Sequence, residues 1–197
     1  MLTLALDTTG PHCAAALARG GAVLAHMSER LGRGHAERLA PMVMEVLEAA
    51  GVEASAIERI AVCTGPGSFT GLRVALSYAK GFALPRRLPV LGVDALKIAA
   101  AACEDGLVVT YRDVRRGEVF AAAFRDGRPL DPPAPMSLAA AEALADQLQC
   151  GLVEAGEADV RVLALLADRL DPADHPAEPL YARAPDAKLP GGRALPA

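Results

Sequence analysis

The sequence has no tryptophan, and aromatic residues make up only 4% of its 197 positions. Alanine, leucine and valine must therefore fill the core, a composition that suits helices packed closely on a sheet. No apolar run approaches the roughly 20 residues needed to span a bilayer. The first residues, Met1 to Asp7, lack the basic flank and the length of a signal peptide. We therefore expect a cytoplasmic protein that does not enter a membrane.

Patterns typical of metal sites and disulfide frameworks are missing as well. The four cysteines are far apart and form no Cys-x-x-Cys pair, and the four histidines include no His-Glu-x-x-His motif. The formal charge is −4, with +2 in residues 1–100 and −6 in residues 101–197. Neither half resembles the basic footprint of an isolated RNA-binding protein. We therefore expect no metal, and RNA contact only within a complex.

The hydrophobic periodicity predicts an α/β chain in which one order of elements occurs twice. The first copy has the order βββαβαβα, and a shorter copy begins at about residue 106. The first copy has predicted strands at 2–6, 13–17, 23–26, 60–63 and 90–91. Its predicted helices lie at 35–50, after the glycine-rich run 65–71 as far as about residue 84, and at 94–103. The second has predicted strands at 107–111, 118–124 and 152–153, and predicted helices at 138–148 and 160–170.

Both copies contain a strand that ends at an acidic turn and is followed by a strand of small residues. Asp7 ends the first of these strands, and Asp113 occupies the matching position in the second copy. We therefore predict a first lobe at residues 1–104, a smaller second lobe at 105–170, and a common cleft that Asp7 and Asp113 both face. The last 27 residues, 171–197, contain six prolines, so we expect an extended or mobile tail there.

Two turns at strand ends could carry chemistry. An aspartate beside two threonines can hold a phosphate or a metal-bound phosphate, and the glycine-rich run that follows the strand at 60–63 could cradle an anion at a helix N-terminus. The same residues could instead form rigid turns, with Ser68 or Thr70 as a side-chain cap at the start of the helix. Both readings stay open for one candidate set: Asp7, Thr8, Thr9, Gly65, Gly67, Ser68 and Asp113.

Several segments together resemble one known family. They are Leu-Ala-Leu-Asp-Thr-Thr at 4–9, His35 with Leu-Ala-Pro at 39–41, the run Gly-Pro-Gly-Ser-Phe-Thr-Gly-Leu-Arg at 65–73, Asp-Val-Arg-Arg-Gly-Glu-Val at 113–119, and Glu-Pro-Leu-Tyr-Ala-Arg at 178–183. Nearly the whole chain is similar to the TsaB (YeaZ) family of tRNA threonylcarbamoyladenosine biosynthesis. The resemblance implies an actin-like ATPase fold (ASKHA, ribonuclease H-like) with two related lobes, the second truncated.

The resemblance also implies a subunit without catalytic activity of its own. The larger paralogue, TsaD, transfers a threonylcarbamoyl group to N6 of adenosine 37 in tRNAs that read ANN codons, and a TsaE-like ATPase joins the assembly. TsaD has a His-x-x-x-His metal pair, and the matching positions here are Ala95 and Ala99, which cannot bind a metal. The chain is expected to have no cofactor of its own, although the complex uses ATP. The alternatives are a small kinase of the same fold, or an inactive glycoprotease-like interaction protein.

The family resemblance places the partner surface on the first-lobe helices, where the chain would bind TsaD, or a second copy of itself when TsaD is absent. The predicted helix at 35–50 is apolar over a wide arc, which favours burial on two sides. Met42 is expected at the edge of the arc and Met44 is expected to be exposed. The predicted contact residues are His35, Leu39, Met42, Val43, Val46, Leu72, Arg73, Leu76 and Lys80.

Overall fold

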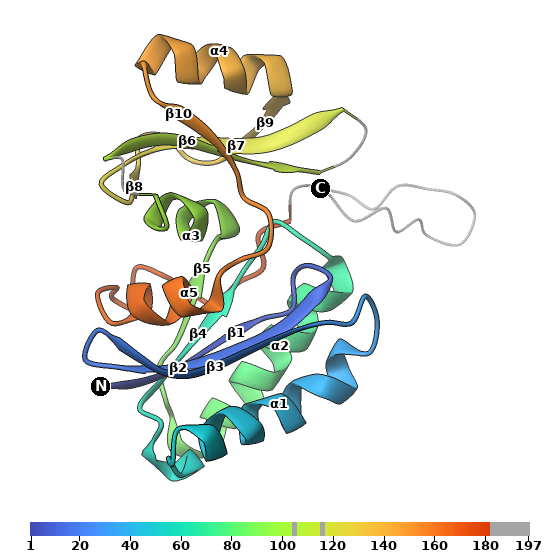
Figure 1. Ribbon diagram of the computed structural model, residues 1–197, viewed down its shortest axis with the longest axis vertical. Coiled ribbons are helices and arrows are strands. Elements are labelled where there is room, and N and C mark those ends of the chain that lie inside the picture. The colour runs from blue at the N-terminus through green and yellow to red at the C-terminus, as the bar shows by residue number, and fades with distance from the viewer. Residues whose placement is uncertain (104–105, 115–116, 182–197) are drawn as a thin grey trace.

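The computed structural model describes residues 1–103, 106–114 and 117–181. The N-terminal half forms a mixed sheet with the strand order β3-β2-β1-β4-β5, the first sheet (Figure 1). The central strand, β1, runs antiparallel to β2 and parallel to β4. The strands are β1 (Leu2–Asp7), β2 (His12–Arg19), β3 (Ala22–Arg30), β4 (Arg59–Cys63) and β5 (Val90–Val93).

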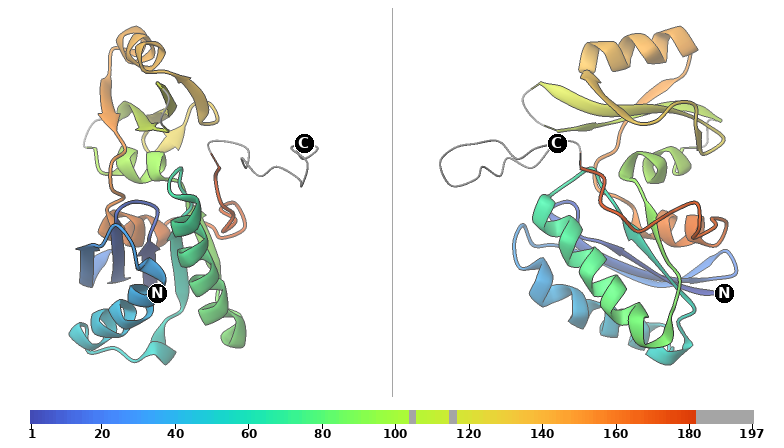
Figure 2. Two further views of the ribbon diagram at one scale, coloured as in Figure 1. Left: turned by 90° about the vertical axis from the view of Figure 1, so that its right-hand side faces the viewer. Right: turned by 180° about the vertical axis from the view of Figure 1, so that it is seen from behind.

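Two long helices, α1 (His35–Ala49) and α2 (Phe69–Ala83), cover one face of this sheet (Figure 2). Strand side chains alternate between faces, and here the alternation also separates them by size. Leucines 2, 4 and 6 of β1 pack against α1 and α2, whereas alanines 14, 16 and 18 of β2 face the other way. The alanine face lets a further helix lie close to the sheet. Short 3₁₀ helices, Ala54–Ala56 and Leu84–Arg86, connect α1 to β4 and α2 to β5.

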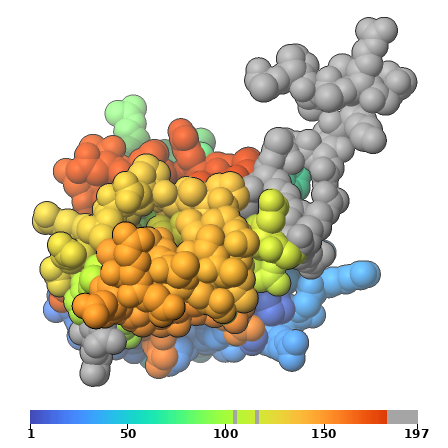
Figure 3. All heavy atoms as spheres, turned by 90° about the horizontal axis from the view of Figure 1, so that it is seen from above, coloured from blue at the N-terminus to red at the C-terminus, as the bar shows by residue number. Residues whose placement is uncertain are grey.

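The second half builds a smaller sheet in which β6 lies between β10 and β7, and both β8 and β9 pair with β7. One helix, α4 (Leu138–Leu148), covers its outer face (Figures 1 and 3). The strands are β6 (Leu107–Asp113), β7 (Glu118–Arg125), β8 (Arg128–Pro129), β9 (Ala134–Ser137) and β10 (Gly151–Glu154). The short strands β8 and β9 were not predicted from the sequence, because prolines interrupt both.

Two helices lie between the sheets, and each packs on the sheet that the other half of the sequence forms. α3 (Ala95–Ala101) packs on β6, whereas α5 (Val160–Ala167) packs on β1 and β2 (Figure 1). Backbone carbonyls at the end of α5 accept hydrogen bonds from Arg59 of β4. The prediction counted residues 160–170 with the second lobe, but the structure places α5 against the first sheet. The predicted boundary at 104–105 lies outside the described residues.

Residues 171–181, which we call the strap, follow α5 and run along the β5 edge of the first sheet. Pro176 forms a bridge with Leu91, and the Leu180 N–H donates to the Thr64 carbonyl at 2.8 Å. An extended segment was predicted here from the prolines. Residues 182–197 of the predicted tail lie outside the described residues.

The topology is that of an actin-like ATPase (ribonuclease H-like) fold with two related lobes. In both halves a strand, β1 or β6, pairs antiparallel with the strand that follows it and parallel with a later strand. The predicted fold class is thereby confirmed. Among the described helices, none combines the length and apolarity needed to cross a bilayer.

Candidate functional site

An open, largely apolar groove lies between α1 and α2. Its volume is about 440 Å³. Phe69 stands at one end with 44% of its surface exposed, and the Arg73 guanidinium lies 3.8 Å from the centroid of its ring. Such aromatic and arginine side chains are enriched at protein interfaces. The lining residues of this α1–α2 groove are Ala36, Leu39, Phe69, Thr70, Arg73, Val74, Ser77 and Tyr78.

Most residues that were predicted to contact a partner lie instead in the core of this chain. Met42 is fully buried, and the prediction that placed it at an exposed edge is wrong. The arc is wider than a single sheet contact would require, because α1 packs against α2 as well as against β2 and β3. Met44 is 59% exposed, as predicted. The other predicted contacts that are buried here are Leu39, Val43, Val46, Leu72 and Leu76.

The remaining predicted contacts lie nearer the surface. Arg73 and Lys80 are exposed on α2, and His35 is half-buried at the start of α1. Only Leu39 and Arg73 of the predicted set line the α1–α2 groove. The sequence analysis missed Phe69, Val74 and Tyr78, which it read only as members of a glycine-rich run and a helix. The signal in the sequence was the helical spacing of residues 70, 73, 74, 77 and 78, which marks a second face of α2 beside its buried face.

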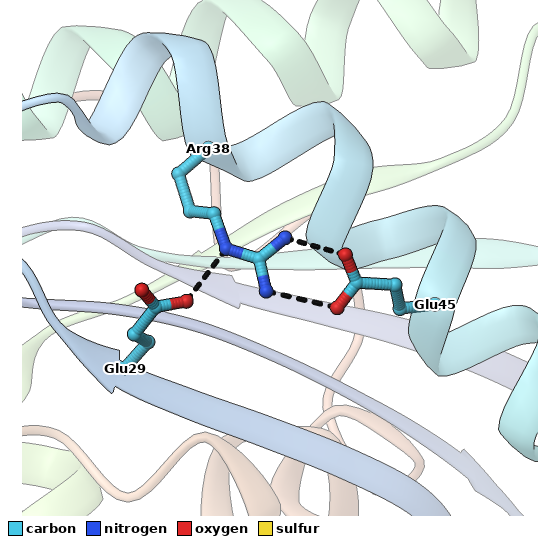
Figure 4. Close-up of polar contacts among 3 residues, drawn as sticks. All are labelled: Glu29, Arg38 and Glu45. Carbon is cyan, nitrogen blue, oxygen red and sulfur yellow. Dashed lines mark hydrogen bonds and ion pairs between the residues drawn. The ribbon is translucent and has the colours of Figure 1, made fainter.

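The two helices that form the groove expose side chains of opposite charge. The guanidinium of Arg38 in α1 makes two parallel hydrogen bonds to the Glu45 carboxylate, at 2.7 and 2.8 Å, and its Nε donates to Glu29 of β3 at 2.6 Å (Figure 4). The two bonds to Glu45 lower the pKa of its carboxyl group, and the bond to Glu29 ties α1 to the edge strand β3. The exposed face of α1 keeps the acids Glu37 and Glu48, whereas α2 contributes the bases Arg73 and Lys80.

The second candidate, the Asp7–Thr9 turn, lies at the end of β1 and is closed by the chain itself. The Thr9 N–H donates to Asp7 Oδ1 at 2.9 Å, and the Thr8 hydroxyl donates to the Gly71 carbonyl at 2.6 Å. All three residues of the turn are at most 2% exposed. The turn is therefore filled by its own backbone and by the start of α2.

The glycine-rich run packs directly on this turn, which explains why glycine occupies two of its positions. The Ser68 N–H donates to the Thr9 carbonyl at 2.8 Å. A Cβ added at Gly67 would lie 2.5 Å from the Thr9 carbonyl oxygen, and one at Gly71 would overlap the Thr8 carbonyl oxygen. Ser68 Oγ accepts from the Gly71 N–H at 3.2 Å and caps α2. Gly65 has φ +94°, a conformation that side chains rarely allow.

Burial dominates the electrostatics of Asp7. Its pKa is raised by loss of solvent, and the Thr9 N–H and the nearby Arg112 charge offset only part of that effect. A carboxylate that is costly to ionise and closed off from solvent is a poor ligand for a phosphate-bound metal. The geometry therefore agrees with the reading of this turn as part of the fold.

The structure does not bring Asp113 to Asp7. Side chains of β6 alternate, and Val109 and Tyr111 face the α4 side of the second sheet. Asp113 shares their parity and is exposed, whereas Arg112 points toward the first lobe, 3.6 Å from a Cβ added at Gly10. The prediction of a common cleft lined by both aspartates is wrong by one residue, since Arg112 holds the place expected for Asp113.

The two positions that the sequence analysis matched to a metal pair of TsaD, Ala95 and Ala99, lie on α3. Ala95 is buried against α5, and Ala99 packs toward the second sheet. Across residues 1–103, 106–114 and 117–181, no three His, Cys, Asp or Glu side chains cluster as a metal site would require. The four cysteines are free thiols.

Comparison with known proteins gives consistent matches. A family model described as TsaD: tRNA N6-adenosine threonylcarbamoyltransferase matches residues 25–154. The chain is 38% identical over 129 residues to the tRNA threonylcarbamoyladenosine biosynthesis protein TsaB of Escherichia coli (strain K12). That match covers 64% of this chain and 55% of TsaB, so it spans about half of the curated relative.

Two further matches extend over almost the whole chain. An uncharacterized protein of Mycobacterium tuberculosis (strain H37Rv) is 34% identical over 202 residues, covering 94% of this chain and 93% of that protein. The solved structure of YeaZ from Pseudomonas aeruginosa superposes with a TM-score of 0.74 at 29% identity, covering 91% of this chain and 99% of that one. Because the family model matches more than half of this chain, the chain belongs to the TsaB (YeaZ) family, within the wider group that the TsaD model describes.

Proposed function

We propose that this chain is a non-catalytic subunit of the cytoplasmic machinery that forms threonylcarbamoyladenosine at position 37 of tRNA. Its role is to bind and activate a TsaD-like paralogue, which performs the transfer. A TsaE-like ATPase and the tRNA join through the complex, as the family resemblance implies. The E. coli relative is named as a tRNA threonylcarbamoyladenosine biosynthesis protein, which supports this pathway.

The observation that carries the proposal is a contrast between two places in the first lobe. The Asp7–Thr9 turn is buried and hydrogen-bonded within the chain, and Ala95 and Ala99 replace the metal-binding pair of the catalytic paralogue. The α1–α2 groove, in contrast, presents an exposed phenylalanine and an arginine without a carboxylate within ion-pair distance among the described residues. The surface suited to binding is therefore the exposed face of the helices and not the buried turn.

The same surface suits self-association when the paralogue is absent. The exposed acids Glu37 and Glu48 lie on α1, and the exposed bases Arg73 and Lys80 lie on α2. A two-fold axis between two copies would set each acidic helix against a basic one. We therefore propose that homodimer and heterodimer compete for the same α1–α2 groove.

The sharpest test fills the groove without touching the core. Ala36 is exposed and lines the groove, so Ala36→Arg places a long charged side chain in the contact and keeps a good helix former. The matched control is Ala49→Arg, at an exposed position near the other end of α1 that does not line the groove. We expect only Ala36→Arg to lose co-purification with the TsaD-like paralogue, and to lower threonylcarbamoyladenosine in tRNA when it replaces the parent protein in a depletion strain.

Three outcomes would count against the proposal. A folded Ala36→Arg protein that binds the paralogue as tightly as the Ala49→Arg protein would exclude the groove as the contact. A parent chain that does not bind the paralogue would overturn the role as its subunit. Phosphate transfer from ATP to a small substrate by the purified chain alone would favour the small-kinase alternative.

A further inference from the structure

The strap brings an aromatic side chain to one end of the α1–α2 groove. The ring of Tyr181 lies 5.3 Å from the ring of Phe69, centroid to centroid, with the planes tilted by 35°. Phe69 also carries the Arg73 guanidinium over its ring. The chain has seven aromatic residues, and three of them, Phe69, Tyr78 and Tyr181, gather at this groove although the core is short of rings.

Specific contacts fix the path of the strap up to this point. The Gly92 N–H donates to the His175 carbonyl at 2.9 Å, and His175 Nε2 lies 2.8 Å from the Lys97 ammonium. Ala177 is 8% exposed and packs into the core cluster beneath α1 and α2. A Cβ added at Gly92 would lie 2.6 Å from the Pro176 carbonyl oxygen, so the strap sits where only glycine leaves room. The strap is therefore an integral part of the first lobe.

The contact with Tyr181 matters for Phe69, because Phe69 is the first residue of α2 and 44% of its surface is exposed. Its neighbours at the mouth of the groove are the exposed residues Ser68 and Thr70. Contact between two rings restricts the rotamers of both and is favourable when the rings are offset or tilted. A side chain that is held in place before binding loses less entropy when a partner arrives.

We infer that Tyr181 is a positioning residue that holds Phe69 and Arg73 in the arrangement a partner recognises, so that the strap forms part of the partner surface. The inference rests on the proposed function of the α1–α2 groove and assigns it a second, C-terminal component. The partner that fits is a helical surface of the TsaD-like paralogue, with an apolar side chain for the groove and a carboxylate for Arg73.

The test measures affinity of the full chain for the purified TsaD-like paralogue, with thermal unfolding as a check on folding. Tyr181→Ala is expected to weaken binding about tenfold, and Tyr181→Phe, which restores the ring, is expected to restore it. The stack lies at the surface, so neither change should move the unfolding midpoint by more than about 2 °C. In a Phe69→Ala background Tyr181→Ala should have no further effect, because Tyr181 acts through Phe69.

Each other outcome is decisive. An unchanged affinity for Tyr181→Ala, with Ala36→Arg still disruptive, overturns the role of the strap and leaves the proposed function standing. An equal loss for Tyr181→Ala with and without Phe69 overturns positioning, since Tyr181 would then contact the partner independently. If Ala36→Arg binds the paralogue normally as well, the α1–α2 groove is not the contact and the inference falls with it; only a parent chain that does not bind the paralogue overturns the proposed function.

Discussion

Two glycines in α2 provide a matched test of how closely this helix is pressed onto the Asp7–Thr9 turn. At Gly71 an added Cβ would overlap the Thr8 carbonyl oxygen and come within 3.3 Å of the Ser68 Cβ. At Gly81, ten residues later and exposed, an added Cβ has nothing within 4 Å. The substitution Gly→Ala is therefore the same chemical change in the same helix with opposite surroundings.

The expected free energies of unfolding follow from these surroundings. Alanine favours a helix over glycine by about 1 kcal/mol, so Gly81→Ala should stabilise by up to that amount. Gly71→Ala has the same intrinsic gain. It must also push α2 off the turn, at about 1–3 kcal/mol for overpacking, and weaken the 2.6 Å bond from the Thr8 hydroxyl, at about 1 kcal/mol. We expect a net destabilisation of about 1–3 kcal/mol.

Thermal unfolding distinguishes the two outcomes. For a chain of 197 residues, 1 kcal/mol corresponds to about 2–4 °C in the midpoint. Gly81→Ala should raise the midpoint by up to about 2–4 °C, and Gly71→Ala should lower it by about 2–12 °C. A Gly71→Ala protein as stable as the Gly81→Ala protein would refute the close packing of α2 on the turn, and with it the reason given for the glycine-rich run.

Two further predictions concern residues that the sequence analysis treated as functional. Met42→Ala should lower the free energy of unfolding, measured with denaturant, by about 2–5 kcal/mol because Met42 is fully buried. Met44→Ala should change it by no more than about 0.5 kcal/mol, and equal effects would contradict the burial of Met42. Asp7→Asn keeps the acceptor for the Thr9 N–H and removes a charge whose pKa burial raises, so the folded state holds that proton to higher pH than the unfolded chain. The variant should therefore be more stable than the parent near pH 7. The two should be equally stable at about pH 3, where Asp7 is protonated in both the folded and the unfolded parent. A variant less stable than the parent at pH 7 would mean that the carboxylate itself stabilises the fold.

The regular elements were predictable because their patterns are local. Each strand of the first sheet and each of the five α-helices begins and ends within a few residues of its predicted bounds. Of the two hydroxyl residues that could cap the second helix, Ser68 and Thr70, the structure uses Ser68. These features depend on periodicity and turn chemistry, both of which a single sequence displays.

The failures concern which way a correctly predicted element faces. A shift of one residue along a strand turns a side chain to the opposite face, and this separates Arg112 from Asp113. The burial of Met42 depends on α2 lying beside α1, a contact between segments about 30 residues apart that helical periodicity does not contain. The groove could not be predicted for the same reason, because it exists only where two helices meet.

The exchange of α3 and α5 between the two sheets has a consequence for synthesis on the ribosome. The alanine face of the first sheet is covered by α5, whose last residue, Ala167, is made after the strands β1 to β10. Until then a nascent N-terminal sheet has its large leucines covered by α1 and α2, and its other face is open. The halves therefore complete their cores together once α5 has been made, and a gene divided at residue 104 would give neither product a closed interior.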